Sequence, residues 1–240
     1  MTICAELADY EWLTGAEAAA VLGDLAGGGE PLHRRAARLR RNFSATRVHL
    51  LLEQVELRQR ARAKFARADE LFFTRRGLEQ ATDEWVAGYK ARRFAGREPV
   101  GDLCCGIGGD LLGLAAVAPS AGVDRDRIVA YLAAANAHAL SRPATVESRD
   151  VSRTSAGDFA SWHMDPDRRP GGRRTSSPAR CSPDAATIAD LLTAAPNAAI
   201  KLAPAAEIPD DWCDACELEW ISRDRQCRQL VGPLSMRLKN

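Results

Sequence analysis

The stretch from Val100 to Asp110 constrains the fold more than any other part of this sequence. It reads as a short buried strand that ends in a glycine turn and leads into a helix over residues 111–117. Gly106 and Gly108 let a ligand approach the backbone, because a side chain at either position would hold it away. The free N–H groups at the start of the helix would then face that ligand. Asp102, at the end of the strand, can accept hydrogen bonds from an amino group, which suits a zwitterionic amino-acid ligand better than a pyrophosphate.

From Pro99 onward, the sequence alternates between strands and helices, which is typical of a parallel sheet. After the strand that contains Asp102, we expect strands over 121–124, 144–147, 159–164 and 197–202, helices over 127–139 and 185–194, and a closing hairpin of 217–222 and 226–231. The sequence therefore predicts an α/β fold for this part of the chain.

Acidic residues stand at the ends of successive strands in this alternation. Asp124 lies 18 residues past Gly106, at the tip of the neighbouring strand, where a carboxylate can accept hydrogen bonds from both hydroxyls of a ribose. Asp150 follows the third strand and Asp165 follows the fourth. A single aspartate at a strand end is common in surface turns, but a series at consecutive strand ends indicates one binding site.

The stretch Asp-Leu-Cys-Cys-Gly-Ile-Gly-Gly, residues 102–109, resembles motif I of the class I S-adenosylmethionine (SAM) methyltransferases, in the version found in the trimethylguanosine synthase family. Three segments bring the chain closer to a bacterial methyltransferase family with a C-terminal THUMP-like domain: FTRRGLEQAT at 73–82, YKARRF at 89–94 and DPDRR at 165–169. The resemblance implies a Rossmann-like class I methyltransferase sheet, mostly parallel and of about seven strands.

The resemblance also assigns residues to the cofactor. Those it implies for SAM binding are Thr82, Asp102, Cys104, Gly106, Gly108, Asp124, Arg125, Asp150 and Val151. Among them, Asp102 and the glycine turn would hold the methionine moiety, Asp124 the ribose and Asp150 the adenine amino group. Thr82 and Gln80 would lie at the rim of the pocket, in a segment that covers the cofactor in such enzymes; both could equally be polar residues of a helix-capping turn.

The same resemblance places the chemistry at Asp165 and Pro166, beside the methyl group. The carboxylate of Asp165 and the carbonyl of Pro166 would orient a nucleophilic nitrogen, and no metal ion is required. Asp167 and Arg168 stand where amino methyltransferases carry a proline and an aromatic residue, so only an arginine could stack on a base there. Residues 170–183 read as a Gly/Arg/Ser/Pro-rich stretch that is either a mobile lid that meets phosphates or simply a disordered loop.

Two other functions stay open. Gly106 and Gly108 also satisfy the first two positions of the dinucleotide fingerprint, but Leu111 occupies the third, and Asp110 would bring negative charge to a pyrophosphate. A nucleotide-dependent oxidoreductase is therefore disfavoured. A non-catalytic SAM- or RNA-binding module is the stronger alternative, because the usual proline and aromatic are missing after Pro166 and because the expected THUMP-like domain is absent from the chain.

Residues 1–95 show helical periodicity without period-two alternation, so we expect a helical N-terminal domain there and the SAM-binding domain at 96–240. Thr14 and Glu17 have the form of a capping box, Pro31 can begin a short helix, and Ser44 can cap a longer one. Thr82 would cap a last helix over 83–94, which would turn its apolar residues Trp85, Val86 and Tyr89 inward.

Basic residues gather between Pro31 and Arg76, where thirteen arginines and lysines stand against four acidic residues, a net charge of +9. Such a block attracts polyanions, although it is also what a solvated arginine-rich helix face looks like. With the resemblance, it favours RNA as the methyl acceptor.

Other sequence features indicate the cellular compartment and whether a metal ion is bound. No apolar run approaches the roughly 20 residues of a membrane span, and the first residues, MTICAE, lack the form of a signal peptide. We therefore expect a cytoplasmic protein with no membrane partner, with a monomer favoured. The odd number of cysteines, seven, indicates reduced thiols. Cys213 and Cys216 form a single C-x-x-C pair with only Cys227 nearby, so we expect no zinc site.

Overall fold

The computed structural model describes residues 5–27, 31–151, 156–168, 177, 180–208 and 217–234. Seven strands form one sheet in the order β3-β2-β1-β4-β5-β7-β6. Their bounds are β1 Val100–Leu103, β2 Ser120–Asp124, β3 Ala144–Ser148, β4 Ser161–Met164, β5 Ala198–Leu202, β6 Glu217–Arg223 and β7 Gln226–Leu234. The first five strands pair in parallel, and β7 is antiparallel to both β5 and β6. The predicted sheet is confirmed.

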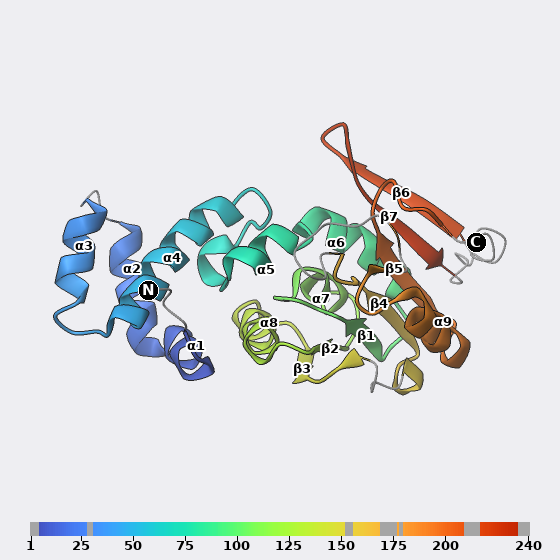
Figure 1. Cartoon of the computed structure of the whole chain (residues 1–240), viewed down its shortest axis with the longest axis horizontal. Helices are drawn as coiled ribbons and strands as arrows, with labels where there is room; N and C mark the ends of the chain where they lie inside the picture. The colour runs from blue at the N-terminus through green and yellow to red at the C-terminus, as the bar shows by residue number, and fades with distance from the viewer. Residues whose placement is uncertain are drawn as a thin grey trace.

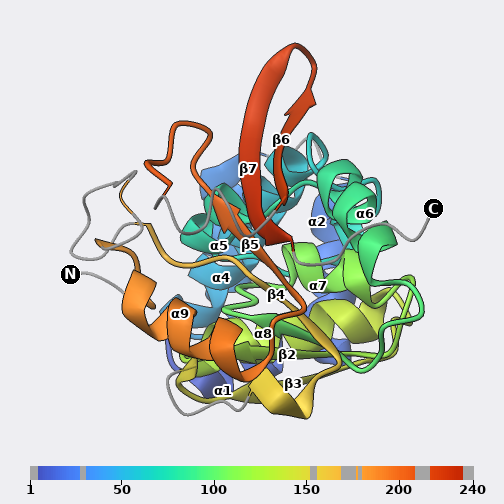
Figure 2. The same ribbon diagram turned by 90° about the vertical axis from the view of Figure 1, so that its right-hand side faces the viewer.

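The helices of this half cover both faces of the sheet (Figure 2). They are α7 Gly109–Leu114, α8 Arg127–Ala139 and α9 Ala185–Ala194, together with the short 3-10 helix η4 Ala156–Asp158. One apolar core joins α9 to β1, β4 and β5, and a second, on the other face, joins α6 and α7 to β1, β5 and β7. The central strands β1, β4 and β5 are buried along their whole length, as strands covered on both faces must be.

The chain before the sheet is helical, with α1 Leu7–Leu13, α2 Ala16–Ala26, α3 Leu32–Leu39, α4 Ala45–Ala61, η1 Ala68–Glu70, α5 Arg75–Gln80, α6 Glu84–Ala91 and η2 Arg92–Phe94. Figure 1 shows α1 to α4 at one end of the molecule and the β6–β7 hairpin at the other, with α5 and α6 running between them. The first helices share an apolar core with α8, to which Leu25, Leu51 and Leu132 contribute. Within the described residues, no helix is long and apolar enough to cross a bilayer.

Several local predictions for this helical part are wrong. The capping box predicted from Thr14 and Glu17 does not form, because Gly15 is the N-cap of α2. Thr14 instead ends α1 and shares a hydrogen bond with the Tyr131 hydroxyl, 2.6 Å away. Asp83, not Thr82, caps α6 by accepting from the Val86 N–H at 3.2 Å. The prediction for Ser44 is confirmed, since its side chain accepts from the Arg47 N–H.

The face that α6 turns inward also differs from the prediction. Val86 is buried, but Trp85 is 68% exposed and Tyr89 45% exposed. The reason is the close packing of α6 on α7: a Cβ at Gly113 would lie 2.8 Å from the backbone of Ala87. The small residues of α6 therefore face α7, and the large aromatic residues lie outside.

Candidate functional site

A pocket of about 570 Å³ opens where the strand order reverses, at the carboxyl ends of β1 and β4. This is where open α/β sheets bind ligands. The pocket is lined by ten of the predicted site residues, which come from five segments of the chain: Thr82, Asp102, Cys104, Gly106, Asp124, Arg125, Asp150, Val151, Asp165 and Pro166. The predicted rim residue Gln80 also lines it.

Gly108 is the one predicted residue that does not line this pocket. It is the N-cap of α7, with φ of 92°, and a Cβ at this position would meet Ala133 of α8 at 3.6 Å. Glycine is needed here for the left-handed turn into α7, which also passes close to α8. Gly108 shapes the loop and does not border the ligand space.

The loop before α7 is held by Asp124. One carboxylate oxygen of Asp124 accepts from the Gly106 N–H at 2.9 Å, and the other accepts from the Asp126 N–H at 3.0 Å. Burial raises the pKa of Asp124, and these two backbone hydrogen bonds oppose that rise. The carboxylate thus links the ends of β1 and β2 across the pocket.

Cys104 lies in the same loop with φ of 62°, in the left-handed region that a non-glycine residue seldom adopts. Burial raises its pKa well above the ordinary range, and the charges of Asp124 and Asp165 raise it further. Cys104 is therefore a protonated thiol in the pocket wall and is not a nucleophile.

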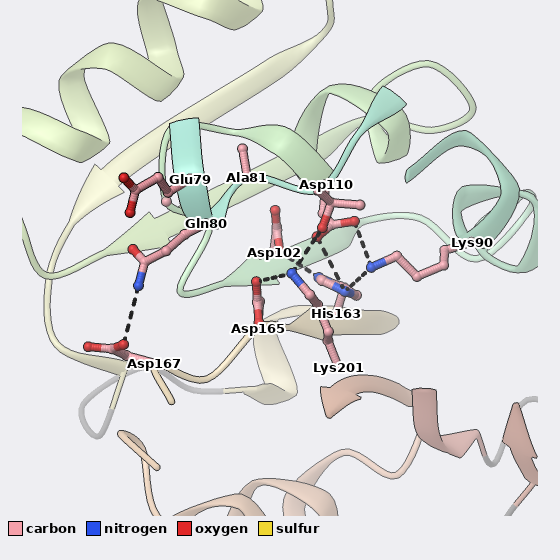
Figure 3. A network of polar contacts seen from close by, with 12 residues as sticks. Glu79, Gln80, Ala81, Lys90, Asp102, Asp110, His163, Asp165, Asp167 and Lys201 are labelled. Atoms are coloured by element: carbon pink, nitrogen blue, oxygen red, sulfur yellow. Dashed lines mark hydrogen bonds and ion pairs between the residues drawn. The ribbon is translucent and has the colours of Figure 1, made fainter. Parts of the chain in front are cut away.

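Asp102 is 1% exposed and belongs to a buried polar chain (Figure 3). Its Oδ1 lies 2.8 Å from Nδ1 of His163, and Nε2 of His163 lies 3.0 Å from Nζ of Lys90. Lys90 in turn forms an ion pair of 2.7 Å with Asp110, in the first turn of α7. Burial raises the pKa of Asp102, although the hydrogen bond from His163 opposes the rise.

Asp165 follows β4, the neighbour of β1 in the sheet, and pairs with Lys201 of β5, whose Nζ is 2.5 Å from its Oδ2. Nζ of Lys201 also donates to the Thr82 hydroxyl at 3.1 Å, and that hydroxyl donates to Asp110 at 2.7 Å. Burial alone would lower the pKa of Lys201, but the charges of Asp165 and Asp110 outweigh it and raise the pKa. Burial would likewise raise the pKa of Asp110, but the charges of Lys90 and Lys201 keep it well below its usual range.

A second bridge joins the Asp-Pro turn to α5. Asp167 pairs with Arg76 at 2.8 Å and accepts from Gln80 at 3.4 Å. Lys64 fixes the chain just after α5, because its Nζ donates to the carbonyls of Leu78, Glu79 and Ala81. Burial, with the nearby charge of Lys201, lowers the pKa of Lys64 to about 8. The segment 79–82 is thereby held against the pocket.

Sequence reasoning missed the three partners Lys90, His163 and Lys201. The signal for two of them was present: His163 and Lys201 are polar residues inside strands that are otherwise apolar, SWHM and AAIKL. A buried polar residue in such a strand needs a partner. Lys90 carried no such signal, because a lysine on a short helix is ordinarily exposed.

The pocket as a whole is acidic. Four basic side chains line it against eight acidic ones, namely Glu79, Asp102, Asp110, Asp124, Asp126, Asp150, Asp165 and Asp167. It therefore suits a ligand that carries positive charge and disfavours a pyrophosphate. In the described residues, no cluster of His, Cys, Asp and Glu is placed to bind a metal ion. Cys213 and Cys216 lie outside those residues, as do residues 170–176, 178 and 179 of the predicted loop.

Comparison with known proteins supports the fold. The chain is 20% identical to a candidate methyltransferase of Porphyromonas gingivalis W83, whose crystal structure superposes with a TM-score of 0.69 over 94% of this chain and 56% of the other. The chain has the Rossmann-like fold of a class I methyltransferase. No protein-family model matches it.

Two curated relatives add sequence similarity. They are uncharacterized S-adenosylmethionine-dependent methyltransferases of Mycobacterium tuberculosis strains CDC 1551/Oshkosh and H37Rv. Each is 37% identical over 135 residues, which is 53% of this chain. The match spans 37% of the length of these relatives.

Proposed function

We propose that this chain is a SAM-dependent methyltransferase that acts on a nitrogen atom of RNA. The observation that carries the proposal is the acidic pocket at the end of the sheet, where Asp102, Asp124, Asp150 and Asp165 converge. SAM carries an ammonium and a sulfonium group, so its charge complements such a pocket. The names of the M. tuberculosis relatives support the same activity.

The residues present fit this cofactor. Oδ2 of Asp102 is buried and has no hydrogen-bond partner among the described residues, so it can accept from the ammonium of the methionine moiety. Asp124 would bind the ribose hydroxyls and Asp150, with Val151 beside it, the adenine. Bound SAM supplies the methyl group; the chain's own part is to position the acceptor and to exclude water.

Asp165 would orient the acceptor amine. Lys201 contacts Oδ2 of this carboxylate, so the amine would donate to Oδ1 and to the carbonyl of Pro166. A carboxylate paired with an ammonium group, as Asp165 is with Lys201, accepts hydrogen bonds and donates none. The lone pair of the nitrogen would then be free to attack the methyl carbon as the bond from that carbon to the sulfonium sulfur breaks, and the nitrogen would afterwards release a proton to water.

RNA as the acceptor is supported by the basic N-terminal helices and by the resemblance to RNA methyltransferases. No acidic residue occurs from Pro31 to Leu52, whereas six arginines do. Arg34 and Arg38 of α3 are exposed, at the end of the molecule away from the sheet (Figure 1). An extended polyanion such as RNA could reach from these helices to the pocket, whereas a small acceptor would not need them.

Calorimetry with SAM tests the cofactor assignment. We expect Asp124→Ala to weaken binding by roughly 10- to 100-fold, which is the effect of losing the hydrogen bonds that one charged group makes to the ligand. Asp190→Ala, on the exposed face of α9, is the matched control and should bind as the wild type does. Equal affinity of the two variants would remove Asp124 from the site. Labelling of fractionated cell extract with tritiated SAM would then identify the acceptor, and label confined to protein or to small molecules would exclude RNA.

One observation favours a second candidate, a SAM-binding module without methyl transfer. Both acids of the Asp-Pro-Asp turn already have cationic partners, Lys201 and Arg76. A turn whose carboxylates are occupied can serve structure alone. SAM binding by calorimetry with no label transferred to any cell fraction would support this candidate.

A further inference from the structure

A buried chain of polar side chains supports Asp102 from behind. Asp102 of β1 and His163 of β4 are register partners in the sheet, and each is 1% exposed. Nδ1 of His163 faces Asp102 at 2.8 Å, and Nε2 faces the ammonium of Lys90 at 3.0 Å (Figure 3). Nδ1 of His163 therefore faces an acceptor, whereas the group at hydrogen-bond distance from Nε2 is a donor; Oδ2 of Asp110 lies further from Nε2, at 3.9 Å.

This arrangement determines where the imidazole proton lies. A lysine ammonium donates hydrogen bonds and cannot accept one, so Nε2 of His163 must be the acceptor. The ion pair with Asp110 keeps Lys90 charged. A doubly protonated ring would set an N–H of a cation against that ammonium, which is repulsive in a buried site. His163 is thus a neutral imidazole with its proton on Nδ1, and it donates to Oδ1 of Asp102.

The tautomer leaves the charge of Asp102 uncompensated. Along the connected contacts there are three carboxylates, Asp102, Asp110 and Asp165, but only two ammonium groups, Lys90 and Lys201. Lys90 and Lys201 lie beside Asp110 and Asp165, so the excess negative charge is at Asp102. Its Oδ2 has no hydrogen-bond partner in the part of the chain that is described, and Asp102 borders the pocket. A buried ionised oxygen in that state is costly unless a ligand binds it.

We propose that His163 is a positioning residue for the cofactor: its Nδ1–H holds Oδ1 of Asp102, so that Oδ2 faces the pocket as the receptor of a ligand ammonium group. Lys90 acts one step further back, because it fixes the tautomer. The inference rests on the proposed function, since it takes the ammonium to be that of the methionine moiety. His163 itself does not line the pocket and would not touch the cofactor.

The tautomer can be measured without any ligand. In the full chain labelled with ¹⁵N-histidine, nitrogen–proton correlation spectra at neutral pH should show His163 protonated at Nδ1 only. The chain has four histidines, and the signal lost in His163→Asn identifies the right one. Protonation at Nε2, or at both nitrogens, would overturn the inference.

A matched pair of variants tests the positioning role. Leucine and asparagine are similar in size and shape, but only the asparagine amide can replace Nδ1–H as the donor to Asp102. We expect His163→Leu to weaken SAM binding about tenfold or more and His163→Asn about threefold or less, as for the loss and retention of one hydrogen bond to a charged group. The exposed His138→Leu is the control and should not change the affinity. Equal losses in the pair, or none, would contradict the role; should His163→Leu not fold, the spectra of the wild type still decide.

The outcomes separate this inference from the function on which it rests. If the wild type does not bind SAM, the proposed function fails, whatever the tautomer. If the wild type binds SAM and Asp102→Asn weakens binding but His163→Leu does not, the function stands and only the role of His163 is lost.

Discussion

Two neighbouring strand ends in the pocket each place an aspartate in a different electrostatic setting. At the end of β1, Asp102 is hydrogen-bonded to a histidine whose ring the neighbouring lysine keeps neutral. After β4, Asp165 contacts the ammonium of Lys201 directly. The first carboxylate keeps its charge for a ligand, whereas the second is already compensated. One pocket can thus bind a cation at one strand end and orient an uncharged nitrogen at the next, and an amine must be uncharged to act as a nucleophile.

The largest expected effect comes from removing the ammonium group that compensates the charge of Asp165. Lys201→Met leaves Asp165 without its ion-pair partner, whereas Asp110 keeps Lys90. Breaking such a buried pair costs about 3 kcal/mol of unfolding free energy. Urea unfolding followed by circular dichroism measures it. The double variant Lys201→Met/Asp165→Asn should recover part of the loss, because it removes the stranded charge of Asp165. A loss below about 1 kcal/mol for the single variant would mean that the pair is solvated.

The comparison predicts a smaller but more specific effect on cofactor affinity. Asp102→Asn should weaken SAM binding roughly 10- to 100-fold, because the amide cannot match a carboxylate as acceptor for an ammonium group. Asp165→Asn should change SAM affinity by about threefold or less and should lower methyl transfer instead. Calorimetry on both variants makes the test, and a greater loss of affinity for Asp165→Asn would reverse the assignment of the two ends.

Acidification should affect the two ends differently. Because burial raises the pKa of Asp102, this carboxyl takes up a proton at a higher pH than the ordinary value of about 3.9. SAM affinity should therefore fall as the pH drops through that raised pKa, and binding should release a proton there. The sign for stability is opposite: the folded state binds this proton more tightly than the unfolded state, so stability falls as the pH rises and Asp102 ionises.

The pH effect can be measured by calorimetry in two buffers of different ionisation enthalpy. Asp102→Asn should abolish the proton release. Asp110 behaves in the opposite way, because its pKa is well below the usual range; its contribution to stability is lost only as the pH falls below about 3.9. Proton release that persists in Asp102→Asn would assign it to another group.

The sequence predicts features that depend on residues close together in the chain, but not contacts between residues that are far apart in it. Periodicity gave the helices Arg127–Ala139 and Ala185–Ala194 with the bounds that the structure shows, and the strand-end acids line one pocket. These are local patterns combined with a general rule of α/β sheets. The exposure of Trp85 could not be predicted, because it depends on the close contact between α6 and α7, which no helical period reveals.

The partners of the acids were beyond sequence reasoning for a similar reason. Lys90 and His163 are 73 residues apart, and Thr82 and Lys201 are 119 apart. Their contacts depend on the register of β4 and β5 beside β1 and on how the α5–α6 connection crosses the strand ends. Only the polarity of His163 and Lys201 within apolar strands pointed to such contacts.

The smallest expected effect comes from a comparison of the two ion pairs in the Asp-Pro-Asp turn. Asp167 pairs with Arg76, as Asp165 pairs with Lys201, but the side chain of Arg76 is 65% exposed, against 8% for Lys201. Solvent screens an exposed pair, so Arg76→Ala should change the unfolding free energy by at most about 0.5 kcal/mol and leave SAM affinity as it is. Urea unfolding beside Lys201→Met measures the difference. Equal destabilisation by the two variants would show that position in the turn, and not burial of the charge, decides the strength of these pairs.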